Sequence, residues 1–141
     1  MVLKSYAKIN LTLQINKRLP SRLHEIQSLF CLVNLFDKIS IKKNKKNKID
    51  NISFRGPFSK LVRKSDNSVK KIMKILRKNK LVSNYYSIKI NKQIPVFGGI
   101  GGGTNNLDKK IKFLIKKKIK KNILNNIIEY VGSDLRLFYY D

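Results

Sequence analysis

The sequence predicts a single α+β domain. Several short segments alternate apolar and polar residues, as strands with one buried face do, and other segments place apolar residues at helical spacing. The predicted order is strands, a helix, a strand, a glycine-rich loop and two helices. With 141 residues, 42% of them hydrophobic, the chain is long enough for one apolar core.

The first predicted strand is residues 8–15, KINLTLQI, which alternate strictly. Because successive side chains of a strand point to opposite faces, one face of this strand would be polar and the other apolar. The sequence therefore predicts a buried face made of Ile9, Leu11, Leu13 and Ile15.

The next segments continue the predicted sheet after a turn around Pro20. The apolar segment 26–36 predicts a strand buried on both faces, and residues 37–43 alternate again. The lysine-rich segment 42–48 is interpreted as a hairpin tip, with 51–54 as the strand that returns from it.

A helical period appears in residues 65–79, where Asp66, Asn67 or Ser68 would cap the first turn. Its apolar positions are Val69, Ile72, Met73 and Leu76. Alternation returns in 85–95, and the residues predicted on one face there are Tyr86, Ile88 and Ile90. Two more helices are predicted after the glycine-rich loop, with apolar residues at 107–119 and 123–128.

The formal net charge is +24, and two interpretations of it compete. A surface that binds nucleic acid would gather cations on one face, with arginine and aromatic residues among them. Compositional drift would place lysine wherever solvent allows it. Because the lysine runs at 42–48, 70–80 and 109–121 contain few arginines and only one aromatic residue, drift is favoured over a nucleic-acid partner.

The cellular compartment is predicted from what the sequence lacks. Cys31 is the single cysteine, which excludes an internal disulfide and suggests a reducing compartment. We expect it to be a small buried residue and not a nucleophile. No apolar run approaches the roughly 20 residues that span a membrane. The N-terminus also lacks the apolar segment of a signal peptide. The prediction is a cytoplasmic protein with no membrane partner.

Residues 95–106, PVFGGIGGGTNN, hold five of the seven glycines and lie between a predicted strand and a predicted helix. Backbone N–H groups of such a turn and of a helix N-terminus point at an anion placed there. Thr104 would add a hydroxyl near phosphate or a metal ion. Since no Gly-Lys-Ser/Thr follows, this is not a Walker loop, and the segment predicts a phosphate site of another kind.

Four segments together resemble one kinase family. The glycine-rich segment resembles the phosphate loop of the GHMP kinases. Within that superfamily, AKINLTL (7–13), LHEIQSLF (23–30) and GSD (132–134) resemble motifs of the 4-diphosphocytidyl-2-C-methyl-D-erythritol kinases, in the same order. The resemblance covers nearly the whole chain and implies a ribosomal-protein-like, two-layer fold with a mixed sheet and helices on one face. Residues 1–141 would be the N-terminal, ATP-binding domain, with the C-terminal domain missing.

The resemblance implies ATP- and Mg²⁺-dependent phosphorylation of a hydroxyl on a cytidine diphosphate derivative, in the non-mevalonate route to isoprenoids. Lys8 and Asp134 match the catalytic pair: Asp134 would take or orient the hydroxyl proton, and Lys8 would stabilise the developing alkoxide. The residues that match substrate-contacting positions are Asn10, His24 and Phe30. Those that match nucleotide-binding positions are Pro95, Gly99, Gly101, Gly102, Gly103, Thr104, Asn67 and Lys92. No residue is assigned to a metal.

Each of these residues also has a purely structural interpretation. Asn67 is equally well explained as a helix cap, Phe30 as a core residue and Lys92 as one lysine among many. The chain departs from the family pattern at Leu23, Asp108 and Arg136.

Two other functions stay open, a different GHMP kinase and a basic RNA-binding protein. Because half of the family's length is absent, we expect little or no turnover by this chain alone. We also expect an uncovered apolar face that a missing half or a partner chain would cover.

Overall fold

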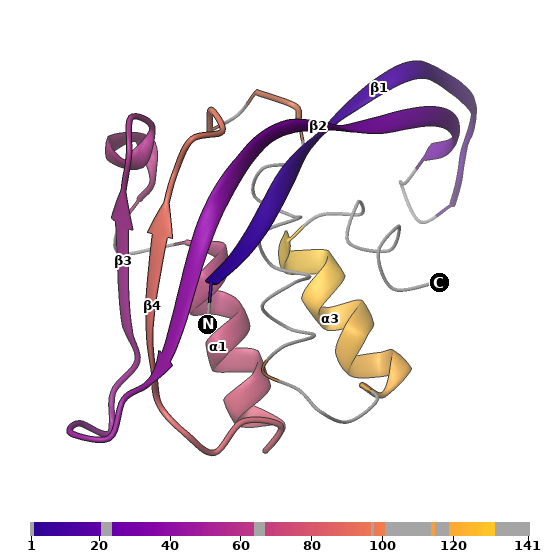
Figure 1. Ribbon diagram of the computed structural model, residues 1–141. Helices are drawn as coiled ribbons and strands as arrows, with labels where there is room; N and C mark the ends of the chain where they lie inside the picture. Colours follow the sequence, from indigo (N-terminus) through magenta and orange to yellow (C-terminus); the bar gives the residue numbers. More distant parts are fainter. Residues whose placement is uncertain are drawn as a thin grey trace.

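The computed structural model describes residues 2–20, 24–63, 67–96, 98–100, 114 and 119–131. Four strands form one mixed sheet, in the order β1-β2-β4-β3 (Figure 1). Neighbouring strands are antiparallel except for the parallel pair β3 and β4. The strands are β1 (Val2–Arg18), β2 (His24–Lys43), β3 (Asn51–Arg55) and β4 (Tyr86–Asn91).

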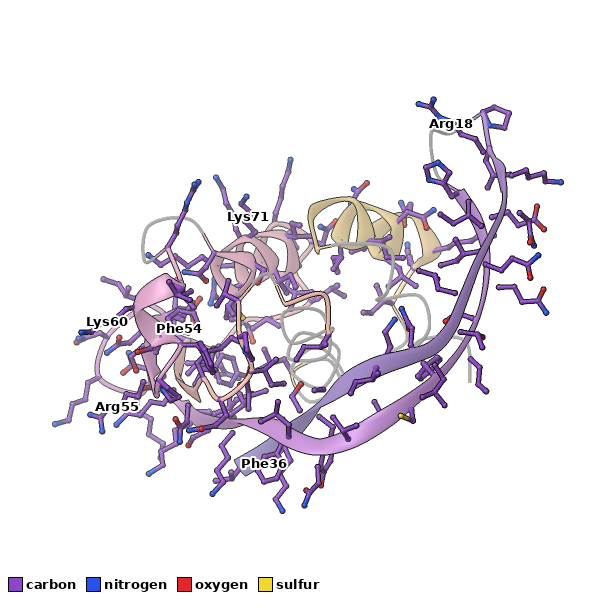
Figure 2. The ribbon with its side chains drawn as sticks, turned by 90° about the horizontal axis from the view of Figure 1, so that it is seen from above. Arg18, Phe36, Phe54, Arg55, Lys60 and Lys71 are labelled. Carbon is purple, nitrogen blue, oxygen red and sulfur yellow. The ribbon has the colours of Figure 1, made fainter. Side chains whose placement is uncertain are left out.

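Two helices, α1 (Ser68–Lys78) and α3 (Lys121–Val131), lie together on one face of this sheet (Figures 1 and 2). This arrangement confirms the predicted fold class, an α+β domain with helices on one side of a mixed sheet. A short 3₁₀ helix, Ser59–Leu61, follows β3. None of the helices among the described residues is long and apolar enough to cross a membrane.

The core lies between the sheet and the two helices. Ile39 of β2 is opposite Ile90 of β4, and Ile41 is opposite Ile88, so the inward side chains of the two strands form one apolar surface. The helices cover it with the residues predicted from their spacing, which are Val69, Ile72, Met73, Leu76, Ile123, Leu124, Ile127 and Ile128. Lys71, on the outer side of α1, points away from the sheet (Figure 2).

The helix predicted at 107–119 falls largely outside the described residues. Two of its predicted apolar positions, Leu114 and Ile119, are described, and both pack against the core.

The burial predicted for the first two strands is wrong, although both strands exist. β4 pairs with β2 only from Lys38 to Lys43. Beyond the end of that pairing, β1 and β2 continue as a long two-stranded ribbon, in which residues 7–18 pair with residues 24–33. Several side chains that were predicted to be buried in these two strands are exposed: Ile9, Leu11, Leu13, Ile15, Ile26, Leu29, Leu32 and Leu35. Cys31 is half-buried. Alternation therefore predicted both strands correctly, but these apolar side chains are not covered by the described residues of other elements.

The ribbon bends away from the rest of the sheet (Figure 2). Its register shifts at three places, between Tyr6 and Ala7, between Asn10 and Thr12 and between Ile15 and Lys17. Such bulges increase the local twist and bend a strand pair. The bending turns the ribbon out of the plane that α1 and α3 cover.

The predicted hairpin between residues 37–43 and 51–54 is also wrong in its pairing. Residues 51–55 do form a strand, β3, but β4 lies between β3 and β2. β3 pairs in parallel with β4, with Ile52 opposite Ile88 and Phe54 opposite Ile90. The apolar residues of β4 thus have partners on both sides, which a hairpin with β2 would not have provided.

Candidate active site

Lys8 lies at the start of the ribbon and is 5% exposed. Its backbone N–H donates to the carbonyl of Ile100, 2.9 Å away, so the glycine-rich segment runs beside the outer edge of β1 at this residue. The loop and Lys8 are 92 positions apart in sequence order but adjacent in space, as the phosphate-site hypothesis requires.

Asn10 and Phe30 share the ribbon face of Lys8. Asn10 is opposite Phe30 in the strand pairing, and alternate residues of one strand point to the same side. The Lys8 ammonium lies 5.4 Å from the centroid of the Phe30 ring, within the range of a cation–π contact. The structure therefore brings together three of the residues predicted for the catalytic and substrate positions.

The beginning of the glycine-rich loop is described from Pro95 to Val96 and from Gly98 to Ile100. Gly99 has φ +67°, a conformation that favours glycine, and no described atom lies within 4 Å of the place where a Cβ would be. Its backbone is thus open on that side, which suits the close approach of a ligand.

The start of this loop is held by Asp37, a residue that the sequence prediction missed. Its buried carboxylate accepts from the Lys92 ammonium at 2.6 Å and from the backbone N–H groups of Gln93 and Ile94 at 2.7 and 2.9 Å. The side chains of Lys92 and Asp37 are 7% and 0% exposed. One carboxylate on β2 therefore fixes the three residues that precede Pro95.

A signal for Asp37 was present in the sequence. It occupies an inward position of an alternating strand, two residues before Ile39 and four before Ile41. A carboxylate on the apolar face of a strand is rarely buried without a partner.

Known proteins resemble this chain in sequence as well as in fold, although no model of a known protein family matches it. The chain is 42% identical over 139 residues to a 4-diphosphocytidyl-2-C-methyl-D-erythritol kinase from Pelagibacter ubique, covering 96% of this chain and 48% of that protein. It is 33% identical over 141 residues to the kinase of the same name from Thermotoga maritima, covering 98% of this chain and 49% of that protein.

The chain is homologous to part of this kinase. It spans about half the length of the relatives that it matches. A crystal structure of 4-(cytidine 5′-diphospho)-2C-methyl-D-erythritol kinase has the same fold, with a TM-score of 0.67 at 21% identity, over 99% of this chain and 48% of that one. The predicted family resemblance and the predicted GHMP-kinase fold are both confirmed. The absence of a C-terminal domain stays a prediction.

Asn67 and Lys92, which were predicted to bind the nucleotide, both have structural roles here. Asn67 caps α1, where its side-chain oxygen accepts from the Lys70 backbone N–H at 3.1 Å and its amide donates to the carbonyl of Arg63 at 3.3 Å. The Lys92 ammonium is bound to Asp37. The Asn67 cap confirms one of the two interpretations, and contact of either residue with a nucleotide stays a prediction.

His24 lies at the far end of the ribbon from Lys8. It is exposed and paired with Arg18, ten residues along β1 from Lys8, which corresponds to about 30 Å of extended strand before bending is counted. Asp134, Gly101, Gly102, Gly103 and Thr104 lie outside the described residues, as do Leu23, Asp108 and Arg136. The pairing of Lys8 with Asp134 therefore stays a prediction.

Three of the described carboxylates are engaged by cations. Asp37 binds Lys92, Asp50 binds Arg77 at 2.7 Å, and Glu25 binds Lys17 at 3.2 Å. Within the described ranges, no three His, Cys, Asp or Glu side chains gather as a metal site would require.

Proposed function

We propose that this chain supplies the ATP-binding half of a kinase that phosphorylates the 2-hydroxyl of 4-diphosphocytidyl-2-C-methyl-D-erythritol. The homology to kinases of that name over nearly the whole chain supports the proposal. The step belongs to the non-mevalonate isoprenoid pathway, and a cytoplasmic location is part of the proposal.

The single observation that carries the proposal is the position of Lys8 against the glycine-rich segment. Its backbone is bonded to Ile100, and its side chain lies on the same ribbon face as Asn10 and Phe30. Phosphoryl transfer depends on positioning and on neutralising charge, and a buried lysine beside a phosphate loop supplies both.

In this proposal each described residue has a limited role. Lys8 stabilises negative charge on the attacking oxygen and favours the ionised form of Asp134. Asn10 and Phe30 contact the substrate, and His24 reads the base from the ribbon's end. Pro95 and Gly99 belong to the phosphate loop, together with Gly101, Gly102, Gly103 and Thr104. Mg²⁺, when bound, would screen the phosphate charge, and the ATP phosphates themselves offer it oxygen ligands.

The proposal is tested by titrating the purified chain with Mg-ATP and with the cytidine diphosphate substrate in a calorimeter, at low and at raised salt. We expect saturable binding that survives salt and weakens at least about tenfold in Lys8→Ala, because one desolvated charge-assisted contact is worth roughly 1.5–3 kcal/mol. The matched control is Lys17→Ala, which removes the same charge from an exposed position of the same strand.

Equal weakening in both variants, together with loss of binding in salt, would leave only a basic surface and would overturn the proposal. Turnover is tested separately. The chain alone should be nearly inactive, and mixing it with the second half of the Pelagibacter ubique relative should produce ATP-dependent phosphorylation that Lys8→Ala abolishes.

A further inference from the structure

The face of the sheet opposite α1 and α3 carries a concentration of positive charge. Alternation places the outward residues of β2 and β4 opposite each other, with Lys38 opposite Asn91, Ser40 opposite Lys89 and Lys42 opposite Ser87. β3 adds Arg55, opposite Asn91, and β1 adds Lys4, opposite Lys38. We call this surface the open face; its cations are Lys4, Lys38, Lys42, Arg55 and Lys89.

The cations of the open face form a band across all four strands. Lys4, Lys38, Asn91 and Arg55 follow one another in register from β1 to β3, over three interstrand spacings or about 14 Å. Lys4 and Lys38 are directly opposite each other, and like charges in that arrangement favour an anion bound between them. Of the carboxylates whose ion pairs the structure describes, none lies on this face: Asp37 and Asp50 pair on the helix side, and Glu25 lies at the ribbon's end.

Two aromatic rings border the band. Tyr6 and Phe36 meet edge to face, with centroids 5.3 Å apart, and the Lys4 ammonium lies 4.6 Å from the Phe36 ring. Figure 2 shows Phe36 on the side of the sheet away from the helices. Between the strands the face is hollowed by about 310 Å³, and the hollow is lined by Val2, Lys38, Ser40, Arg55, Lys89, Ile90 and Asn91.

We propose that the open face binds single-stranded nucleic acid, with the phosphodiester backbone along the lysine and arginine band and unpaired bases at Phe36 and Tyr6. A positively charged groove with adjoining aromatic rings is the combination that single-stranded nucleic acid requires. Rings stack on bases only where the bases are unpaired, so a duplex is not the expected ligand. Tyr6 is two residues from Lys8 along β1, but this proposal does not rest on the proposed kinase function.

The lysines that form this site are mostly not those of the lysine runs in the sequence. The run at 70–80 lies largely in α1, in the other layer, and the run at 42–48 lies mainly in the connection from β2 to β3. The open face is made of single lysines separated by apolar residues that point inward. An anionic membrane is a less suitable partner, because membrane binding also needs protruding apolar side chains. Among the described residues of this face, Val2 is the one large aliphatic side chain that is exposed.

The test is a fluorescence anisotropy titration of a short labelled single-stranded RNA at several salt concentrations, with the DNA of the same sequence in parallel. The variant Lys38→Gln/Lys89→Gln removes two charges from the open face. Its matched control, Lys74→Gln/Lys78→Gln, removes two exposed charges from α1. Circular dichroism and thermal melting of each variant verify that the fold is kept.

We expect the open-face variant to bind at least about tenfold more weakly. The dependence of log K on log salt should also flatten, by about 0.7 for each phosphate that the variant no longer neutralises. The α1 variant should change affinity by less than about threefold. Phe36→Leu should weaken binding about tenfold and leave the salt dependence unchanged, because base stacking involves no counterion.

Three results would overturn the proposal: equal weakening in both lysine variants, which would indicate general attraction to a basic protein; no effect of Phe36→Leu; or binding to anionic lipid vesicles without binding to the oligonucleotides. Equal affinity for RNA and DNA would support recognition of the shared backbone, and a preference for RNA would support contacts to its 2′-hydroxyls.

Discussion

Under α1 and α3, the inward side chains of β2 and β4 are almost completely buried, and Ile39 and Ile88 have no exposed surface. In the β1–β2 ribbon, side chains of the same type at the same alternation are open to solvent, with Leu11 60% and Leu13 55% exposed. The two regions share the strand β2, and their local sequences are alike. They differ in whether a second layer of structure covers them.

This difference shows that alternation determines a strand but does not determine its burial. The covered region is stabilised by apolar area removed from water, about 25 cal/mol for each Å². The ribbon gains little from that source, and its backbone pairing is its main support. An exposed apolar ribbon of this size is typical of a surface that contacts another protein segment or a ligand, and the chain matches only half of its relatives' length.

The largest effect is expected at the boundary between the two regions, where Asp37 holds the start of the glycine-rich loop. Asp37→Ala should lower the free energy of unfolding by about 3–5 kcal/mol, because it leaves the buried Lys92 ammonium without its counterion. Chemical denaturation measures this change. Nucleotide affinity should fall as well, since the amides of Gln93 and Ile94 lose the acceptor that fixes them.

The control for Asp37 is the ion pair of the ribbon. Glu25 and Lys17 are 47% and 68% exposed, and Glu25→Ala should cost no more than about 1 kcal/mol. If the two substitutions cost the same, the boundary between a buried and an exposed region does not exist in solution.

The next largest effect is expected from substitutions that remove one apolar side chain from each region and so compare how well the two regions are packed. Leu76 of α1 has no exposed surface, and Leu76→Ala should cost about 2–5 kcal/mol. The same substitution in the ribbon, Leu13→Ala, should change stability by no more than about 0.5 kcal/mol. A cost for Leu13→Ala near that of Leu76→Ala would mean that the ribbon is covered in solution, for example by a second copy, and the protein concentration dependence of unfolding would then reveal the association.

Local patterns were sufficient to predict most of the covered region. Helical spacing identified the buried residues of α1 and α3, and alternation identified Tyr86, Ile88 and Ile90. The pairing of β3 with β4 was not predictable in this way, because it joins residues that are 36 positions apart and depends on which strand edge is free. The exposure of the ribbon was missed for a similar reason: whether a layer covers a strand is decided by distant parts of the chain.

The candidate site was predictable only in part. Motif resemblance predicted Lys8, Asn10 and Phe30 as site residues, and the structure brings them together on one face of the ribbon, where the Lys8 backbone N–H donates to Ile100. Asp37 was missed because its partners, Lys92 and the amides after it, lie 55 to 57 residues away and become neighbours only when β2 pairs with β4.

The smallest effect is expected at Asn67, where two substitutions can separate the role of its side chain as a helix cap from a contact with the nucleotide. Asn67→Ala should destabilise the protein by about 0.5–2 kcal/mol, because the Lys70 N–H at the start of α1 loses its acceptor. Asn67→Ser keeps an acceptor oxygen at the cap, so thermal melting should show most of that stability restored. The affinity for Mg-ATP then decides the second role. If it returns with stability in Asn67→Ser, Asn67 acts only as a cap of the covered region. If it stays low while stability returns, the amide itself contacts the nucleotide, and α1 contributes to the site as well as to the core.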